Sequence, residues 1–375
     1  MLVVGIPKET RELEARVAAT PDSVKKLMKR KGVEVRIEQG SGASAGFSDP
    51  DMSQSGAKIV SASEAFQSDI VLKIQKPTME EIAKLKKGAV LLSLLEPYLA
   101  DGTMEALAKA GVSAVGMELI PRTTRAQSMD VLSSQANIAG YRAALEAATH
   151  YGRFCPMMMT SAGSSKPAKV LVLGAGVAGL QAIATARKLG SVVEAFDVRA
   201  EVKEQILSLG AKFVEIDLGE EGSGSGGYAK ELSEAAKKKQ IAALTEKIQK
   251  MDIVISTANI PGRKAPTLVT AEAVRGMRTG SVIVDMAAQS GGNCELTEKD
   301  KVVKKHGVTV VGLTHYPSLL ATDSSAYFAN NHLNLMALFL KEKDGATVVE
   351  WDLKDDILDA ALATHENQVR FGRKS

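Results

Sequence analysis

Three glycines, Gly174, Gly176 and Gly179, have the G-x-G-x-x-G spacing of a turn that holds the pyrophosphate of a dinucleotide. The first permits a sharp bend, the second lets the pyrophosphate approach the backbone, and the third lets a helix pack closely on the sheet. A helix beginning near Val177 would offer its free N–H groups to the phosphates. Asp197 follows 23 residues after Gly174 and can accept hydrogen bonds from the adenosine ribose. The spacing therefore predicts a dinucleotide site.

The elements that this turn requires are present around it. An apolar run, Val170–Leu173, predicts a strand buried on both faces of a parallel sheet, and a second strand ends at Asp197. The carboxylate of Asp197 would repel a 2′-phosphate, so it favours NAD(H) over NADP(H). Arg199, two residues later, could accommodate such a phosphate and weakens this preference. NAD(H) is the expected cofactor.

A second group of polar side chains precedes this unit, in PRTTRAQSMDVLSSQ at Pro121–Gln135. We expect a loop here, leaving a strand at its carboxyl end, where ligands bind in α/β sheets. Its candidate binding side chains, with the next residue but one, are Arg122, Arg125, Gln127, Ser128, Asp130, Ser133, Ser134, Gln135 and Asn137. The alternative is a solvated loop that ends in a helix N-cap at Asp130 or Ser133. Composition alone leaves both interpretations open.

A glycine-rich segment, DLGEEGSGSGG at Asp217–Gly227, carries five glycines in eleven residues. Such a composition disfavours regular structure and predicts a mobile loop. It could be a surface linker, or a lid with Tyr228 as its contact residue. Long loops within compact domains are usually functional, which favours the lid.

The pattern of strands and helices predicts an α/β protein with two Rossmann-like domains, whose parallel sheets flank a nucleotide-binding cleft. We expect one domain to comprise residues 1–135 and 318–375, without a phosphate turn, and the NAD(H)-binding domain to comprise residues 136–317. Predicted helices include residues 136–150, 228–250 and 318–340, with 151–166 as a connection and 341–375 as a peripheral ending. The strands expected in the first domain are 2–7, 34–38, 58–60, 69–75, 89–95 and 112–118.

Composition excludes several classes of function. The formal net charge is +3 over 375 residues, and basic residues are not concentrated, so nucleic acid is not an expected partner. Cys155 and Cys294 lack metal-ligand spacing and indicate free thiols in a reducing compartment. The first residues do not form a signal peptide, and no apolar run approaches 18 residues. We expect a cytoplasmic protein, peripheral to a membrane at most, with no metal.

Several blocks of sequence resemble the NAD(H)-binding component of proton-translocating nicotinamide nucleotide transhydrogenase. They are RTTRAQSMDVLSSQANIAGYRA, PMMMTSAG, KVLVLGAGVAGLQAIATARKLG, GGYAKE, VDMAAQSGGNC and the opening GIPKETRELEARVAATP. Alanine dehydrogenase is similar in the opening block, the glycine turn and the VDxAxxxGG segment. Its catalytic Lys corresponds to Gln75 in LKIQKP and its His to Glu96 in LLSLLEP, while Arg16 matches a substrate-carboxylate Arg. Oxidation of an amino acid needs a base, and hydride transfer between nicotinamides does not, so these departures favour the transhydrogenase.

The resemblance implies transfer of hydride from NADH to NADP⁺ held on a partner subunit, coupled to proton translocation. It places Gln127, Arg122, Asp130 and Ser133 at the nicotinamide end, where the catalytic step occurs. The further cofactor-binding residues it implies are Ser128, Met129, Gly174, Gly176, Val177, Gly179, Asp197, Val198, Arg199, Gly227, Tyr228, Gln240 and Asn259. It also implies a homodimer that works with NADP(H)-binding and membrane-spanning subunits at the inner face of the cytoplasmic membrane. Alanine dehydrogenase-like oxidation is the alternative function.

Overall fold

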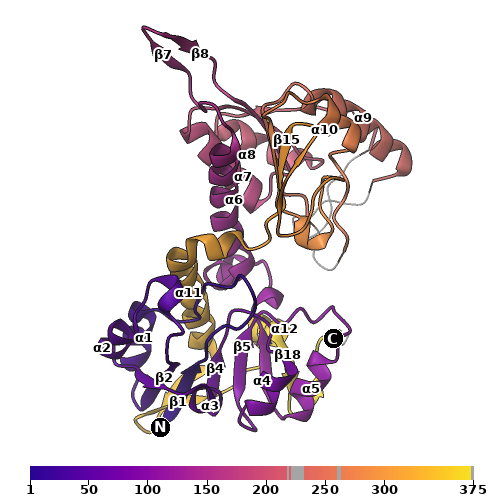
Figure 1. Ribbon diagram of the computed structural model, residues 1–375. Coiled ribbons are helices and arrows are strands. Elements are labelled where there is room, and N and C mark those ends of the chain that lie inside the picture. Colours follow the sequence, from indigo (N-terminus) through magenta and orange to yellow (C-terminus); the bar gives the residue numbers. More distant parts are fainter. Residues whose placement is uncertain (218, 221–231, 260–262, 373–375) are drawn as a thin grey trace. The chain divides into compact units, whose positions relative to one another are not determined.

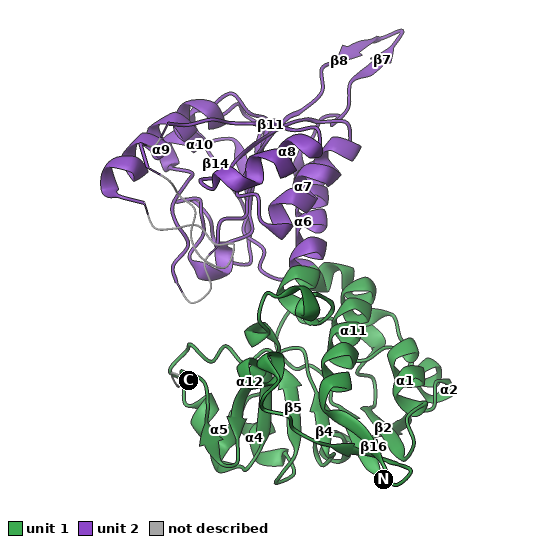
Figure 2. Ribbon diagram, turned by 180° about the vertical axis from the view of Figure 1, so that it is seen from behind, with its two compact units in different colours: residues 1–135, 317–375 green, residues 136–316 purple. Residues whose placement is uncertain are grey.

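The computed structural model describes residues 1–217, 219–220, 232–259 and 263–372 of the chain. It divides into two compact units (Figures 1 and 2). Unit 1 comprises Met1–Gln135 and Pro317–Ser375, and unit 2 comprises Ala136–Tyr316. Each unit has its own sheet with helices on both faces, which confirms the predicted α/β class with two Rossmann-like domains.

The sheet of unit 1 has eight strands in the order β19-β18-β6-β5-β4-β1-β2-β3. The first six in chain order pair in parallel, so that the order 3-2-1-4-5-6 of a doubly wound dinucleotide fold is present. Their bounds are β1 Leu2–Ile6, β2 Val33–Glu38, β3 Lys58–Val60, β4 Ile70–Leu72, β5 Val90–Ser93 and β6 Ser113–Gly116. The order reverses between β1 and β4, and the loops that follow these two strands therefore form the topological switch point of unit 1.

Short helices cover the two faces of this sheet. They are α1 Pro21–Met28, α2 Asp49–Gln54, α3 Ala62–Phe66, α4 Met79–Lys84, α5 Thr103–Lys109, α11 Ala321–Phe339 and α12 Asp356–Ala361, with 3-10 helices η1 Ala43–Ala45, η2 Met117–Leu119, η3 Thr124–Met129 and η7 Tyr316–Leu320. Four of them begin with a capping box, as at Thr20 and Ser23 before α1. Alternation along β4 sends Ile70 and Leu72 into one core and Val71 into the other. The strands are thus buried on both faces.

The C-terminal segment, predicted to be a peripheral ending, is integral to unit 1, and that prediction was wrong. After the β-hairpin β16 Leu340–Lys343 and β17 Ala346–Val349, strand β18 Leu362–His365 pairs antiparallel with β6, and β19 Gln368–Val369 adds the sheet edge. Trp351 stacks on Phe339 at a centroid distance of 4.7 Å. The Thr364 hydroxyl donates to the Val112 carbonyl at 2.8 Å and accepts from the Ala114 amide at 3.1 Å. These partners lie some 250 residues away in the chain, which is why local patterning missed them.

The sheet of unit 2 has seven strands in the order β11-β10-β9-β12-β13-β15-β14. All pair in parallel except β14, which runs antiparallel to β15 and was not predicted. Their bounds are β9 Lys169–Leu173, β10 Val192–Phe196, β11 Lys212–Phe213, β12 Ile253–Ser256, β13 Val282–Asp285, β14 Val302–Lys305 and β15 Val308–Val311. The first six parallel strands again follow the order 3-2-1-4-5-6, with the switch point between β9 and β12.

The helices of unit 2 pack on both faces of its sheet (Figure 2). They are α7 Val177–Lys188, α8 Lys203–Ser208, α9 Glu234–Ile248 and α10 Ala271–Gly276, with 3-10 helices η4 Ala200–Val202 and η6 Ala288–Ser290 and the greater portion of α6 Val131–His150. The predicted helix at 228–250 begins only at Glu234, where the Ser233 hydroxyl accepts the Ala236 amide at 3.3 Å. Helix α6 begins five residues before its predicted start.

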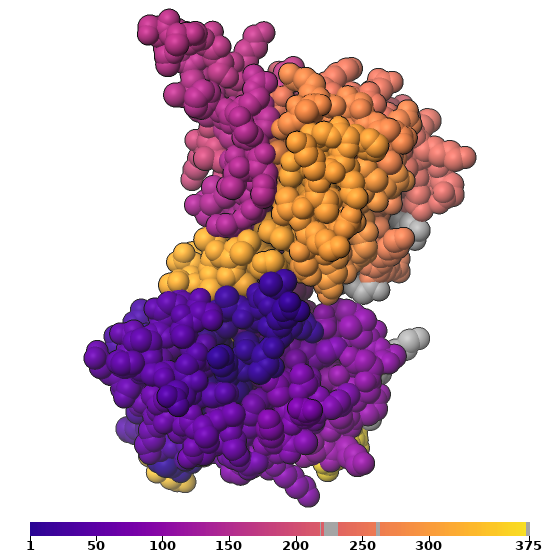
Figure 3. Space-filling model, viewed as in Figure 1, coloured from indigo at the N-terminus to yellow at the C-terminus, as the bar shows by residue number. Residues whose placement is uncertain are grey.

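The predicted connection at 151–166 contains a β-hairpin, β7 Met158–Thr160 with β8 Gly163–Ser165, which projects from the body of unit 2 (Figures 1 and 3). The side chains of β7 are exposed, and Met157 and Met159 are 64% and 75% exposed. In the described portion of the chain, no helix has the length and hydropathy of a membrane span, and no three carboxylate, imidazole or thiol side chains gather as metal ligands would.

Candidate functional site

The glycine turn of unit 2 provides a cradle open to a phosphate. Gly174 has φ +96, a left-handed conformation that favours glycine, and it turns the chain out of β9. Gly176 is the N-cap of α7 and offers no side chain, and a Cβ placed on it would meet no atom within 4 Å. Val177, the first residue of α7, is 40% exposed. The free N–H groups of this helix end therefore face open space, as anion binding requires.

The third glycine sets how closely α7 approaches the sheet. A Cβ at Gly179 would lie 1.9 Å from the carbonyl oxygen of Gly174, a distance that no side chain can occupy. That carbonyl also accepts a hydrogen bond of 3.0 Å from the hydroxyl of Thr257, which follows β12. The turn is thus fixed from both strands of the switch point, where a ligand binds in folds of this kind. Thr257 was not singled out from the sequence.

Asp197 lies directly after β10 and is 9% exposed. Its Oδ2 accepts the backbone amide of Ala175, inside the glycine turn, at 2.7 Å. Arg199 folds back on the same carboxylate, with Nε donating to Oδ1 at 2.9 Å and Nη2 donating to Oδ2 at 2.7 Å. The hydrogen bond and charge of Asp197 raise the pKa of Arg199. The predicted ribose-binding carboxylate and the possible phosphate-binding guanidinium therefore form one ion pair.

The other predicted residues of unit 2 occupy different settings. Asn259 is exposed after β12, and its Oδ1 accepts from the Ser290 hydroxyl at 2.8 Å. Gln240 is buried within α9, at 6% exposure, and Val198 is partly buried against two apolar clusters. Gly227 and Tyr228, with most of the glycine-rich segment predicted to be a lid, lie outside the described residues.

Asp285 at the end of β13 is a fully buried carboxylate that our sequence reasoning missed. It accepts the Ala287 amide at 3.0 Å, the Cys294 amide at 2.9 Å and the Thr297 hydroxyl at 2.6 Å. These bonds fold the segment 286–294 into a compact turn after the strand. The only local signal is an acidic residue that directly follows an apolar strand, a pattern that it shares with Asp197.

In unit 1, the segment predicted to be a polar loop is largely helical. Residues 124–129 form η3, and α6 begins at Val131. Asp130 caps α6, because its Oδ1 accepts the Ser133 amide at 2.9 Å and its Oδ2 accepts the Ser133 hydroxyl at 2.6 Å. The N-cap interpretation therefore holds for Asp130. Arg122 and Gln127 are exposed, whereas Met129 is buried.

Contacts within unit 1 hold this segment from the other side. The Ser128 carbonyl accepts the side-chain amides of Asn331 and Asn334, both at 2.9 Å. Arg125 forks onto Asp355 at 2.6 and 2.8 Å and also pairs with Asp356. The Arg125 guanidinium lowers the pKa of Asp355 to about 2, and both carboxylates raise the pKa of Arg125. Arg125 thus joins η3 to the start of α12, so its candidate binding role is replaced by a structural one.

The switch point of unit 1 gathers the residues that distinguish the two related enzymes. Gln75, after β4, donates through Nε2 to Glu14 Oε2 at 2.6 Å and accepts from Arg11 at 2.6 Å. Arg16 is 7% exposed and forks onto Glu14 at 2.8 and 2.6 Å. Glu96 pairs with Arg11 at 3.7 Å. The sequence marked Gln75, Glu96 and Arg16, but not the Glu14 carboxylate that joins two of them.

Burial raises the pKa of Glu14, but the hydrogen bond and charge of Arg16, with further hydrogen bonds from Gln75 and Ser318, outweigh it and lower the pKa to about 2. Glu14 therefore stays ionised and occupied. Gln75 presents an amide, which has no basic nitrogen at neutral pH. The pair of residues at 75 and 14 consequently holds structure here and supplies no general base.

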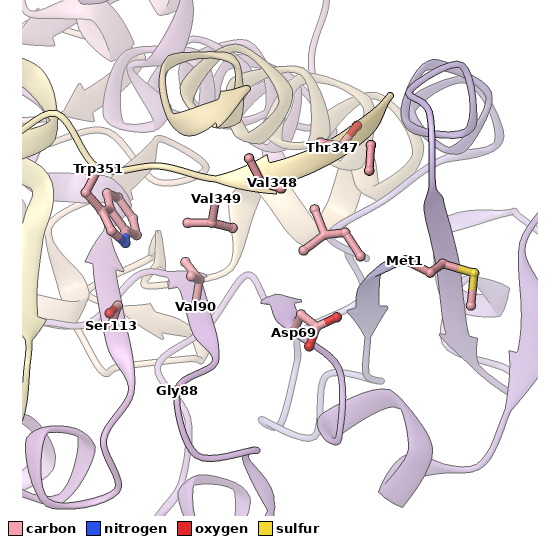
Figure 4. A pocket seen from close by; sticks show the side chains of 11 residues that line it. Met1, Asp69, Gly88, Val90, Ser113, Thr347, Val348, Val349 and Trp351 are labelled. Atoms are coloured by element: carbon pink, nitrogen blue, oxygen red, sulfur yellow. The ribbon is translucent and has the colours of Figure 1, made fainter. Parts of the chain in front are cut away.

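Two pockets are found in unit 1. One of about 380 Å³ is lined by Trp351, Val348, Val349, Asp69 and neighbouring residues (Figure 4). Asp69, Gly88 and Ser113 precede or begin β4, β5 and β6, so this pocket lies at the amino ends of the strands, away from the edge where ligands bind. The second, of about 330 Å³, lies at the carboxyl ends, between the residues after β1 and those after β4, and includes Gln75 and Arg11.

Known proteins match both units. The chain matches the family models "Alanine dehydrogenase/PNT, N-terminal domain" over residues 5–139 and "Alanine dehydrogenase/PNT, C-terminal domain" over residues 143–372. The chain belongs to the alanine dehydrogenase/PNT family. It is 48% identical to an NAD(P) transhydrogenase subunit alpha chain of Rhodospirillum rubrum, over 98% of this chain and 97% of that one. An alanine dehydrogenase of Mycolicibacterium smegmatis is 28% identical over 98% and 94%.

A solved structure agrees with this order of similarity among family members. The transhydrogenase from Sinorhizobium meliloti has a TM-score of 0.85 at 41% identity, with 98% of each chain covered. A solved L-alanine dehydrogenase has a TM-score of 0.79 at 27% identity, covering 98% of this chain and 96% of the other. Within the family, this chain is therefore more similar to these transhydrogenases than to these alanine dehydrogenases.

Proposed function

We propose that this chain is the NAD(H)-binding component of a proton-translocating NAD(P) transhydrogenase. It holds NADH while hydride passes to NADP⁺ on a partner subunit, and the complex couples this transfer to proton movement. Bound NADH supplies the hydride. The chain contributes binding and orientation, because a nicotinamide-to-nicotinamide transfer needs no group that takes up a proton from the substrate.

The observation that carries the proposal is the pairing of an open dinucleotide cradle with the lack of a basic residue at position 75. The cradle at Gly174–Gly179 is open at Gly176, and Asp197 lies where an adenosine ribose is bound. Gln75, by contrast, is an amide held by Arg11 and Glu14. The 48% identity to a transhydrogenase α subunit supports the same assignment.

We propose roles for individual residues on the same basis. Arg122, Gln127, Asp130 and Ser133, with Ser128 and Met129, act at the nicotinamide end, and Gln127 controls the approach of the two rings. Its exposure in η3 leaves its amide available to a ligand. Asp130 and Ser133 act mainly by holding the start of α6, because their hydrogen-bonding groups are engaged with each other. Val198, Gly227, Tyr228, Gln240 and Asn259 complete the cofactor site.

We further propose that the protein is a homodimer, located at the inner face of the cytoplasmic membrane through NADP(H)-binding and membrane-spanning subunits. The hairpin β7–β8 supports self-association, because Phe154, Met157 and Met159 are 57%, 64% and 75% exposed there. Exposed apolar groups that cluster in this way commonly mark protein interfaces. A two-stranded hairpin by itself is marginally stable, which also favours a partner surface.

A single assay tests the central proposal. The chain is mixed with the NADP(H)-binding partner domain, NADH and an NADP⁺ analogue whose reduction can be followed by its absorbance. We expect reduction that depends on both proteins. In parallel, L-alanine and NAD⁺ are supplied to the chain alone, and we expect no NADH. Alanine-dependent NADH production would overturn the proposal in favour of alanine dehydrogenase activity, for which Arg16 would be the carboxylate ligand.

A further inference from the structure

The carboxylate of Asp197 is saturated by the chain's own donors. Its Oδ1 accepts the backbone amide and Nε of Arg199, both at 2.9 Å, and its Oδ2 accepts Nη2 of Arg199 and the Ala175 amide, both at 2.7 Å. An ionised carboxylate offers about four lone-pair positions. Four donors therefore occupy the group that an adenosine ribose needs as its acceptor.

These four donors differ in how readily they can leave. The Ala175 amide belongs to the glycine turn, and the Arg199 amide belongs to the backbone that leaves β10. Withdrawal of either would require the backbone to move. The Nε and Nη2 groups, in contrast, can leave by rotation of one side chain. They number two, as do the hydroxyl groups of a ribose.

We propose that the Arg199 side chain competes with the adenosine ribose of NAD(H) for Asp197, so that cofactor binding exchanges the guanidinium fork for the ribose hydroxyls. This inference rests on the proposed NAD(H) site. It makes Arg199 a specificity-determining residue, because it acts on the carboxylate that discriminates between the two dinucleotides.

The ion pair has opposite consequences for NADH and NADPH. For NADH, the fork must be broken before Asp197 can accept the ribose, so Arg199 weakens binding. For NADPH, Arg199 neutralises the carboxylate that would repel the 2′-phosphate, and its displaced guanidinium can pair with that phosphate. The side chains of Arg199 and Asp197 are 11% and 6% exposed, so solvent screens this charge pairing little. Removal of the guanidinium should therefore shift the two affinities in opposite directions.

The test is the dissociation constant of the full chain for NADH and for NADPH, measured from nucleotide fluorescence. We expect Arg199→Met to bind NADH about tenfold more tightly, as loss of one charge-assisted interaction from the free state implies. NADPH should bind more weakly to the same variant. Arg199→Lys can pair with only one portion of the carboxylate and should fall between wild type and Arg199→Met for NADH. Arg275→Met removes an exposed arginine from α10 in the same unit and should change neither constant.

Other outcomes would overturn the inference. Weaker NADH binding by Arg199→Met would show that Arg199 contacts the cofactor favourably, and a parallel change for both dinucleotides would show a merely structural role. If Arg199→Met does not fold, as judged by circular dichroism, Arg199→Lys decides: NADH binding no tighter than wild type would refute competition. Failure of wild type and all variants to bind NADH would instead refute the NAD(H) site itself, and with it this inference.

Discussion

Gly179 and Gly174 are so close that a Cβ on Gly179 would lie 1.9 Å from the Gly174 carbonyl oxygen. The packing of α7 against the carboxyl end of β9 therefore depends on one missing methyl group. The same helix end has open space at Gly176. The two glycines consequently serve different purposes, packing at 179 and ligand approach at 176, and substitution should separate them.

Gly179→Ala should destabilise unit 2, because the added Cβ forces α7 away from the turn. We expect the free energy of unfolding to fall by about 1–3 kcal/mol, with loss of NADH binding. Gly176→Ala is the matched control: its Cβ meets no protein atom, so thermal stability should stay close to wild type while NADH binding weakens. Equal stability of the two variants in thermal unfolding would contradict this division of roles.

Gln127→Asn shortens the exposed amide of η3 by one methylene. We expect NADH to bind nearly as in wild type, and hydride transfer to NADP⁺ on the partner domain to slow by on the order of tenfold or more, because misplacement of the reacting groups by about 1 Å is costly. Rapid-mixing kinetics of the reconstituted complex would measure this. Gln67→Asn, an exposed amide in unit 1 that bonds the Lys84 carbonyl, is the control. Wild-type transfer rates in Gln127→Asn would refute the role.

Glu14 predicts a specific pH dependence of stability. Its pKa falls from 4.5 to about 2 on folding, so its ionised form stabilises the folded state above pH 4.5, by about 3 kcal/mol from the shift. That contribution is lost as the pH falls from 4.5 through about 2. Glu14→Gln should lower the free energy of unfolding at pH 7 and narrow its difference from wild type toward pH 2. A difference that is constant over pH 2–7 in urea denaturation would contradict this.

The exposed hairpin predicts a solution property. The double variant Met157→Ser, Met159→Ser removes two apolar side chains from the tip region and should weaken self-association, shifting the mass measured by sedimentation toward the monomer at low micromolar concentration. Met79→Ser, which removes a methionine that is 49% exposed in unit 1, should leave the mass unchanged. A monomeric wild type would refute the homodimer.

Thr364→Val tests whether the C-terminal strand is integral to unit 1. The change keeps the side-chain shape but removes the hydroxyl that serves the Ala114 amide and the Val112 carbonyl, both buried at 1% exposure or less. Leaving these groups unpaired should cost about 1–3 kcal/mol in the free energy of unfolding. Stability indistinguishable from wild type would indicate that β18 contributes little to the sheet.

The amino-acid sequence by itself determined the features that are local. The strand β9, the glycine turn and the start of α7 follow from contiguous residues, because backbone freedom at Gly174 and apolar periodicity need no distant partner. The expected alternation of strands and helices in both units follows for the same reason. Where local patterns conflicted, as at Pro121–Gln135, polarity suggested a loop although Asp130 and Ser133 begin a helix.

The tertiary structure alone decided which polar groups are occupied. That Glu14 engages Gln75 and Ser318, that Arg125 engages Asp355, and that β18 pairs with β6 depends on residues 60 to more than 300 positions apart. Even the near neighbours Asp197 and Arg199 could not be paired from sequence, since the direction of each side chain follows from where β10 ends against the glycine turn. Hydrogen bonding depends on distance and direction, and only the folded chain defines both.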